Sequence, residues 1–275
     1  MTGLVEIVQG RELLWNLTLR ELRSKYKRSA LGWFWSMLNP LSSVAIYGVV
    51  FGLLFKITAN PGNPSRLDNF ALYLSCGLLP WNYLTNSLAS ATGAVVNNSN
   101  LLKKVYFPRE YVIVATVFAM TVSFLIELSV LMVVFLVFGQ LVLQWIPIVL
   151  LLVIVQTVLV LGYSLFLGAL NVYFRDMQHL ISIVLQVWFY LTPVVYVMDR
   201  YIPLHQTVAG VSIPVRSLYL FNPMVHVVTA FRNVLYDGRM PGTLSMTYLV
   251  LTSCVVLALG WGFFRKVEHR MVEEL

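Results

Sequence analysis

The sequence predicts an all-α, polytopic membrane protein with a single domain over residues 1–275 and six transmembrane helices. Two observations support this fold class. Hydrophobic residues make up 59% of the chain and charged residues only 11%, whereas soluble domains carry about 25% charged residues. The chain also contains several long stretches without charge, and about 20 apolar residues suffice to cross the roughly 30 Å hydrocarbon core as a helix.

The predicted spans are stretches that contain at most one acidic or basic residue. The charge-free run over 128–174 is too long for one helix, and the segment "FGQLVLQWIP" (138–147) divides it. The spans are predicted within 29–55, 69–102, 111–138, 147–174, 177–198 and 240–264. An even number of spans places both termini on the same side of the membrane.

The distribution of Lys and Arg predicts that both termini are cytoplasmic. With the N-terminus inside, most of the 19 basic residues fall in inner segments, as the positive-inside rule requires. This rule accounts for the net charge of +7. Nucleic acid is therefore not expected as a partner.

Residues 11–28, "RELLWNLTLRELRSKYKR", precede the first span. Trp15, Leu19, Leu22 and Tyr26 recur at helical spacing, which predicts an amphipathic interface helix on the inner leaflet; an ordinary positive-inside flank is the alternative. The basic residues can bind anionic lipid head groups, and a lipid pyrophosphate is a second candidate ligand. These residues are Arg20, Arg23, Lys25, Lys27 and Arg28.

Residues 199–243 form a long, partly apolar segment between the fifth and sixth spans. Asn222 followed by Pro223 is typical of a helix start, and the "DG" at 237–238 closes the segment. The helix between them is too short to span the membrane. It is expected either to be re-entrant at the external face, lining a cavity, or to form a structural lid.

Motifs for several kinds of enzyme chemistry are missing from the sequence. No Gly-Lys dipeptide is present, so a P-loop for ATP is excluded. No paired aspartates, Gly-x-Ser-x-Gly elbow or His-Glu-x-x-His motif occurs, and no metal site is predicted. These absences favour a non-enzymatic protein, with no cofactor in this chain.

The segment 97–110 between the second and third spans is basic and aromatic and contains Pro108, which stops or redirects a helix. Aromatic and Arg side chains commonly anchor protein interfaces. The segment is therefore a candidate docking helix at the inner face, and a positive-inside loop with snorkelling lysines is the alternative. The candidate docking residues are Asn100, Lys103, Lys104, Tyr106, Phe107, Pro108, Arg109 and Glu110.

Four stretches together resemble one family of proteins. They are "YKRSALGWFWSMLNPL" (26–41), "LLKKVYFPRE" (101–110), "VWFYLTPVVY" (187–196) and "FNPMVHVVTAFRNVLY" (221–236). The resemblance is to the membrane subunit of bacterial polysaccharide ABC exporters, which move O-antigen, capsule, teichoic acid or galactan chains. It covers essentially the whole chain, in order.

The resemblance implies a homodimer in the bacterial cytoplasmic (inner) membrane that pairs with two copies of a separate ABC ATPase. ATP and Mg²⁺ would then bind the partner ATPase. Residues 97–110 match the family's coupling helix, 11–28 its interface helix and 199–243 its re-entrant helices at the external mouth. The implied substrate is a glycan on a polyprenyl-pyrophosphate carrier.

The first and fifth spans carry aromatic residues, and in the family these spans border the channel. Aromatic rings can stack on sugar rings, although Trp and Tyr also favour membrane interfaces. The candidate channel-lining residues are Trp33, Trp35, Trp188, Tyr190 and Tyr196.

Glu127 is the only acidic or basic residue deep in a predicted span. A charge there costs about 2.5–3.5 kcal/mol, so the carboxylate is expected to be paired or to face water. A helix–helix hydrogen bond that fixes packing is the favoured role.

The favoured function is therefore a permease for polysaccharide export. The alternatives are a permease of the same class that exports a drug, haem or a simple lipid, and a membrane-embedded glycosyltransferase. The missing paired carboxylates count against the glycosyltransferase.

Overall fold

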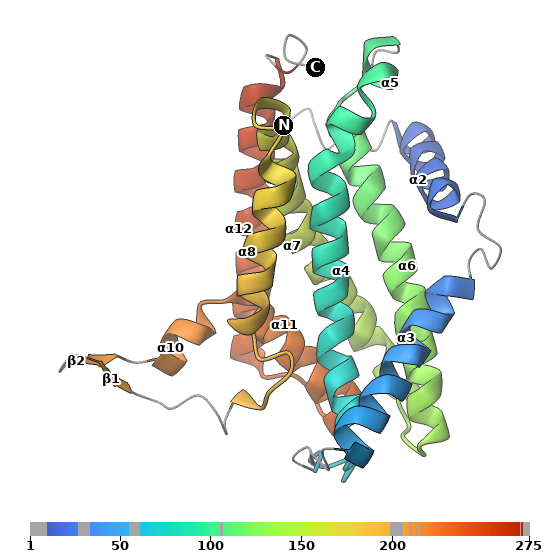
Figure 1. The fold of residues 1–275 in the computed structure, drawn as a ribbon, viewed down its shortest axis with the longest axis vertical. Coiled ribbons are helices and arrows are strands. Elements are labelled where there is room, and N and C mark those ends of the chain that lie inside the picture. The colour runs from blue at the N-terminus through green and yellow to red at the C-terminus, as the bar shows by residue number, and fades with distance from the viewer. Residues whose placement is uncertain are drawn as a thin grey trace.

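The computed structural model describes residues 10–26, 34–54, 61–104, 107–198, 206–208, 211–213, 215–269 and 271. These residues form a helical bundle with a small β-hairpin at one side (Figure 1). The first half contains α2 (Arg11–Tyr26), α3 (Phe34–Tyr47), the π-helix η1 (Gly48–Leu54), α4 (Phe70–Asn97), α5 (Ser99–Lys104) and α6 (Glu110–Val137). The second half contains η2 (Leu143–Trp145), α7 (Ile146–Tyr173), α8 (Met177–Tyr190), β1 (Gln206–Val208), β2 (Val211–Ile213), α10 (Val215–Leu220), α11 (Pro223–Phe231), the π-helix η3 (Arg232–Asp237) and α12 (Thr243–Glu268).

The helix α4 lies at the centre of the bundle and packs against α3, α6, α7, α8 and α11 (Figure 1). On one side of this centre α12 packs along α7, and on the other α2 packs on α6. The short helix α5 and the end of α12 lie at one end of the bundle, whereas α11 lies toward the opposite end. The predicted docking segment and the predicted re-entrant segment are therefore well separated along the bundle.

Three helices among the described residues combine the length and hydropathy that a membrane crossing needs: Glu110–Val137, Leu143–Tyr173 and Thr243–Glu268. These correspond to the third, fourth and sixth predicted spans. The other three predicted spans coincide with α3–η1, with α4 and with α8. Six spans in total remain a prediction.

The predicted helix boundaries at the 138–147 break and at Gly238 are confirmed. The start of α4 has a cap that the sequence analysis did not identify, since the Asn69 side chain accepts a hydrogen bond from the Leu72 amide. The predicted break in 138–147 separates α6 from α7. At the end of η3, Gly238 has φ of 72°, a left-handed conformation that glycine adopts without a Cβ clash.

Two expectations need correction. The fifth span was expected to reach Met198, but α8 ends at Tyr190 and the chain continues in turns. The all-α class holds for the bundle, but β1 and β2 pair as an antiparallel hairpin within the 199–243 segment. Sequence analysis missed this hairpin because two strands of three residues leave too short a pattern of alternation to recognise.

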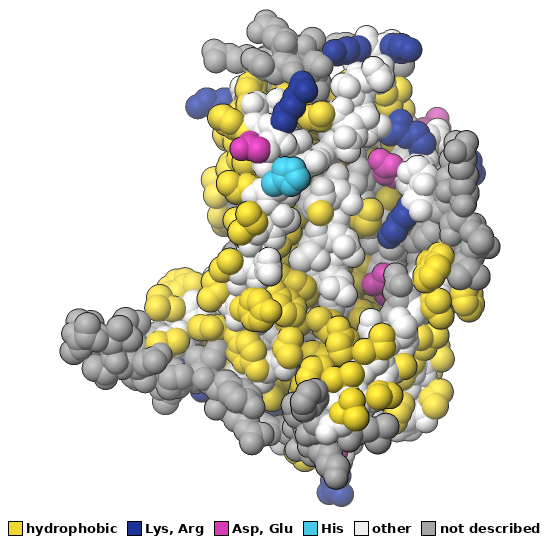
Figure 2. All heavy atoms as spheres, viewed as in Figure 1, with side chains coloured by type: hydrophobic (Ala, Val, Ile, Leu, Met, Phe, Trp, Pro, Cys, Tyr) yellow, Lys and Arg dark blue, Asp and Glu magenta, His cyan; other side chains and the backbone are white. Residues whose placement is uncertain are grey.

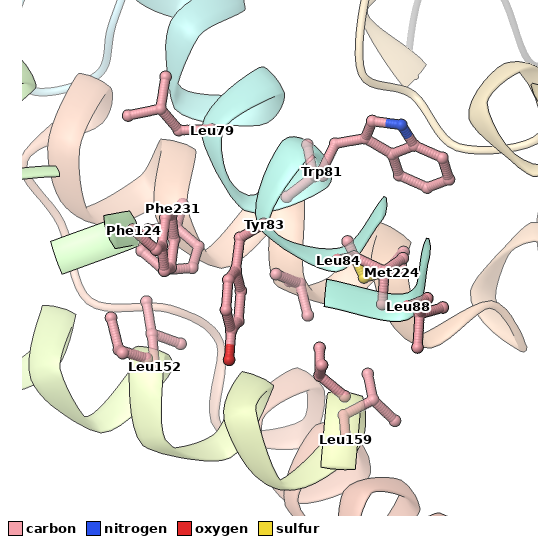
Figure 3. Packing of buried hydrophobic residues seen from close by; sticks show 14 of the residues in the cluster. Leu79, Trp81, Tyr83, Leu84, Leu88, Phe124, Leu152, Leu159, Met224 and Phe231 are labelled. Carbon is pink, nitrogen blue, oxygen red and sulfur yellow. The ribbon is translucent and has the colours of Figure 1, made fainter. Parts of the chain in front are cut away.

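The core joins α4, α6, α7 and α11 through one aromatic cluster (Figure 3). The Tyr83 ring of α4 stacks on Phe124 of α6, with centroids 4.6 Å apart, and Phe231 of α11 lies against Phe124. The Tyr83 hydroxyl donates to Thr157 Oγ1 at 3.0 Å and lies 2.8 Å from Thr121 Oγ1. Satisfying this buried hydroxyl avoids a desolvation cost and fixes the three long helices relative to one another.

The helices α7 and α12 cross closely where both carry glycine. A Cβ atom built on Gly162 would lie 2.6 Å from the backbone of Val256 and Leu257, and one on Gly260 would collide with the Gly162 backbone. Small residues allow such close approach between membrane helices. A nearby glycine, Gly262, has open space where its Cβ would be.

Candidate functional site

The helix α5 and the residues after it form the candidate docking end. Asn100, Lys103 and Lys104 are exposed, and α5 projects beyond the ends of the long helices (Figure 1). In Figure 2, Lys and Arg side chains gather at this end, whereas the lower half of the visible face is mostly hydrophobic. The structure thus places two of the predicted docking lysines where a partner protein can reach them.

The segment after α5 is held by the bundle. Phe107 packs, together with Leu101, against a small cluster that joins α2 to the start of α6; its buried members are Leu14, Leu17, Tyr111, Val114 and Ala115. The guanidinium of Arg109 donates to the backbone carbonyl of Glu268 at the end of α12. The segment after α5 is therefore connected to α2, α6 and α12.

The remaining predicted docking residues differ in position. Pro108 is half-buried, and Tyr106 lies outside the described residues. Glu110 is only 3% exposed, so its side chain is part of the interior at the start of α6. Within this chain, Glu110 is thus not presented to a partner in the way that Lys103 is.

The helix α2 packs against α6 through one face. Leu14, Leu17, Thr18 and Leu22 are buried, while Trp15 is 61% exposed. Of the predicted stripe, Leu22 lies in the buried face and Trp15 does not, because aliphatic residues fill the contact with α6. The exposed tryptophan suits a position at a membrane interface.

Two basic residues of α2 contact the bundle. Arg20 Nη2 donates to Asn98 Oδ1 at 2.6 Å, at the junction of α4 and α5. Lys25 Nζ donates to Ser123 Oγ on α6 at 3.1 Å. Arg23 is exposed, and Lys27 and Arg28 lie outside the described residues. A head-group role for this set stays a prediction.

Glu127 lies one helical turn after Ser123 on α6 and is partly buried. Lys25 of α2 is its charged neighbour. This carboxylate was expected to be paired or to face water, and Lys25 on α2 is the candidate partner.

The predicted channel aromatics fall into two groups. Tyr190 is 68% exposed and Trp35 43% exposed, and both can face a path outside this single chain. Trp188 instead lies edge-on to Trp81 and Tyr163, with ring centroids 6.0 and 5.7 Å away. Tyr196 is partly buried, its hydroxyl donating to the Tyr190 carbonyl, and Trp33 lies outside the described residues.

Sequence analysis missed the role of Asn222 beyond helix capping. Its Oδ1 accepts hydrogen bonds from the Met224 amide at 3.0 Å and from Trp188 Nε1 at 2.9 Å. Its Nδ2 donates to the Leu191 carbonyl at 3.2 Å and to Thr192 Oγ1 at 2.9 Å. One side chain therefore fixes both the start of α11 and the end of α8.

Arg232, also missed, makes a second connection between the same elements. Its guanidinium donates to the carbonyls of Pro193 at 2.6 Å, of Val194, and of Tyr73 at 3.4 Å. The guanidinium carbon lies 3.9 Å from the centre of the Tyr73 ring. The fifth span can end at Tyr190 because this buried cation satisfies carbonyls in the turn that follows. A basic residue inside an apolar helix was the available signal.

These hydrogen bonds join two of the four stretches on which the family resemblance rests. The stretch 187–196 supplies the carbonyls and the indole, and the stretch 221–236 supplies Asn222 and Arg232. A family model for the ABC-2 type transporter matches residues 12–236 of the chain. The chain belongs to this family.

Relatives match over nearly the full length of this ABC-2 type transporter. The O-antigen export system permease protein RfbA of Myxococcus xanthus is 30% identical over 271 residues, covering 98% of each chain. A protein of the same name from Klebsiella pneumoniae is 28% identical and covers 96% of this chain and 95% of its own. The polysialic acid transport protein KpsM of Escherichia coli is 24% identical, covering 93% of each chain.

Family membership makes the chain a membrane transport subunit and not an enzyme. In ABC-2 type transporters the ATPase is a separate subunit. The described part of the chain contains no group of three or more His, Cys, Asp or Glu residues that could hold a metal ion.

Proposed function

We propose that the chain is the membrane subunit of an exporter that moves a polyprenyl-pyrophosphate-linked polysaccharide across the bacterial cytoplasmic membrane. The observation that carries this proposal is the full-length similarity to permeases named for O-antigen export and polysialic acid transport. Similarity over the whole chain includes both ends of the bundle, so it covers more than the shared helical core.

In this proposal, two ATPase subunits bind at the α5 end and drive the cycle with ATP and Mg²⁺ of their own. The exposed side chains of Lys103 and Lys104 support the binding of the ATPase at this end. So does the anchoring of Arg109 on α12 and of Phe107 on the cluster with α2. A push on α5 would reach three helices at once.

The glycan would pass between two copies of the chain. The helix α8 supports this arrangement because it leaves apolar side chains uncovered along its length, with Ile183 63% exposed and Val187 56% exposed. Tyr190 is exposed at the end of the same helix. A second copy would shield such a face, and the rings could offer sugar a weak stacking surface.

Six spans with both termini in the cytoplasm complete the proposed arrangement. The α5 end then lies inside, and the α11–η3 end forms the external mouth. The basic side chains at the α5 end agree with the positive-inside rule (Figure 2).

The proposal is tested by removing the chain from its host and measuring where the glycan accumulates. We expect the deletion strain to lose surface polysaccharide and to retain lipid-linked glycan inside, with export restored by the wild-type chain. Glycan on intact cells and in lysates would be compared by carbohydrate staining of gels.

The deletion also separates the alternatives. Unchanged surface glycan together with new sensitivity to a drug or to haem would overturn the proposal in favour of a small-molecule exporter. A loss of total glycan, with none retained inside, would instead favour a role in synthesis.

A further inference from the structure

A polar cavity lies at the α11–η3 end of the bundle. It has a volume of about 320 Å³ and is bounded by the loop before α4, the turn after α8, and η3. Pockets for small molecules cover about 300–1,000 Å³, so this cavity suits a ligand near the lower limit. The sequence analysis allowed the 199–243 segment to line a cavity, but it named none of the residues that form this one.

The cavity has a rigid floor. Arg232 and Tyr73 form it, with the guanidinium held by three backbone carbonyls. The loop before α4 is tied to η3, since Ser65 Oγ donates to the Tyr236 carbonyl at 2.6 Å and the Asn63 amide donates to Asp237 Oδ1 at 3.3 Å. A cavity fixed in this way would bind a ligand without a large ordering cost.

The rim of the cavity carries planar polar side chains in a connected arrangement. Arg239 Nη2 lies 3.0 Å from Asp237 Oδ2, and Arg239 also donates through Nε and Nη2 to Asn233 Oδ1 at 3.2 and 3.0 Å. Because arginine only donates, the atom of Asn233 that faces it must be the carbonyl oxygen. The other end of this amide is therefore an NH₂ group, which has no hydrogen-bond partner among the described residues.

The walls are apolar and flat, and Pro61, Pro193 and Val197 contribute to them. Sugar rings combine hydroxyl groups, which both donate and accept hydrogen bonds, with apolar ring faces. An amide donor, a carboxylate acceptor and a guanidinium beside aliphatic walls match that combination. A lipid tail fits less well here than in the neighbouring cavity of about 750 Å³ on the other side of α11, where Leu220, Phe221 and Val225 contribute to the lining.

The charges of the lining favour neutral or acidic sugars. Arg232 and Arg239 carry positive charge and Asp237 negative charge, which leaves one net positive charge. Partial burial raises the pKa of Asp237, and Arg239 beside it acts in the opposite direction. A sugar with a free ammonium group would meet a net repulsion.

We propose that this cavity binds one neutral or carboxylate-bearing sugar ring of the glycan as it leaves the transporter. The inference rests on the proposed function, which makes this end the external mouth. Contact with one sugar ring at a time would guide the glycan outward. Such contact would remain weak enough to release the glycan.

The test uses the full-length chain in complex with its ATPase, reconstituted in lipid nanodiscs. Saturation-transfer NMR would measure binding of D-galactose, D-mannose, L-rhamnose and D-glucuronate. Three variants would be compared with the wild type: Asn233→Ala, Asn233→Asp, and the control Ser217→Ala, which changes the neighbouring apolar cavity instead. Asn233→Asp keeps an acceptor for Arg239 but removes the free NH₂ group, so it separates ligand binding from folding.

We expect at least one sugar to bind the wild type and the Ser217→Ala control equally. Binding should fall roughly fivefold in Asn233→Ala, as for the loss of one neutral hydrogen bond. Asn233→Asp should weaken glucuronate more than the neutral sugars, because it adds a negative charge to the rim. Equal binding by the wild type and both Asn233 variants, or no binding of any of the four sugars, would overturn the proposal.

Surface glycan measured in the same strains keeps the two proposals distinguishable. If the wild-type chain restores export and both Asn233 variants bind sugar normally, the proposed function stands and the sugar site is wrong. If the wild-type chain does not support glycan export at all, the proposed function itself fails.

Discussion

The two ends of the bundle use their polar residues in opposite ways. At the α11–η3 end, Asn222 and Arg232 are bound to the backbone and side chains of the segment that follows α8. At the α5 end, Lys103 and Lys104 are exposed, and Asn98 and Arg109 each provide a single connection to another helix. Buried polar residues at the α11–η3 end thus complete the fold, whereas the exposed lysines at the α5 end remain accessible to a second protein.

The largest effect is expected from replacing Arg232 by methionine. The variant would remove the donor from the buried carbonyls of Pro193 and Val194 in the turn after α8, and each orphaned group costs about 1–3 kcal/mol. We therefore expect a loss of roughly 2 kcal/mol or more, measured as reduced thermal stability of the purified chain. Arg239→Met is the matched control, because its ion pair is exposed and worth at most about 1 kcal/mol. Equal stability of the two variants would show that Arg232 does not hold this end together.

The next largest effect is expected at the close crossing of α7 and α12. Gly260→Ala places a methyl group against the Gly162 backbone, and such overpacking costs about 1–3 kcal/mol. Gly262→Ala, two residues further on α12, has open space and should be tolerated. Thermal unfolding of both variants checks this, and a stable Gly260→Ala protein would rule out the close crossing.

A smaller effect is expected for Asn222→Ala, which removes the cap of α11 and the bonds to Trp188 and Leu191. Loss of a helix cap costs about 0.5–2 kcal/mol. Asn222→Asp keeps the acceptor for Met224 and Trp188 but loses the donor to Leu191, so it should lie between the wild type and the alanine variant. Tryptophan fluorescence during denaturation would give the order of stability of the three proteins. If Asn222→Asp were less stable than Asn222→Ala, the proposed role of Asn222 would be wrong.

The smallest effect on stability, within about 0.5 kcal/mol, is expected for the double change Lys103→Ala and Lys104→Ala. Both side chains are exposed on α5, so the fold does not depend on them. Recovery of the ATPase in pull-downs from native membranes should nevertheless fall sharply. A destabilised protein would mean that these lysines serve the fold instead.

Much of the helical arrangement could be predicted because it depends on local signals. The Asn222–Pro223 pair and Gly238 act through neighbouring backbone atoms, and they begin and end a helix as expected. The end of α8 could not be predicted, because it depends on Arg232, which is 38 residues or more from the carbonyls it binds in that turn. Which residues of α2 pack on the bundle could not be predicted either, since the tertiary contact with α6 decides it.

The candidate sites likewise contain some residues that local sequence could predict and others that only tertiary contacts bring together. Exposed lysines in a basic segment could be recognised from composition, whereas Glu110 at 3% exposure could not be told from the exposed Lys103 and Lys104. The polar cavity gathers Asn63, Tyr73, Pro193 and Asn233 from four separate segments. No spacing in the sequence brings such residues together, so only the fold reveals them.

We expect the α5 end, and not the α11–η3 end, to dock the ATPase. A photo-cross-linking residue placed at position 103, and in a second protein at position 239, would test this in native membranes with the ATPase present. Both positions are exposed and lie at opposite ends of the bundle. Position 103 should cross-link to the ATPase and position 239 should not. A cross-link from position 239, or none from position 103 in an intact complex, would show that the ATPase docks elsewhere.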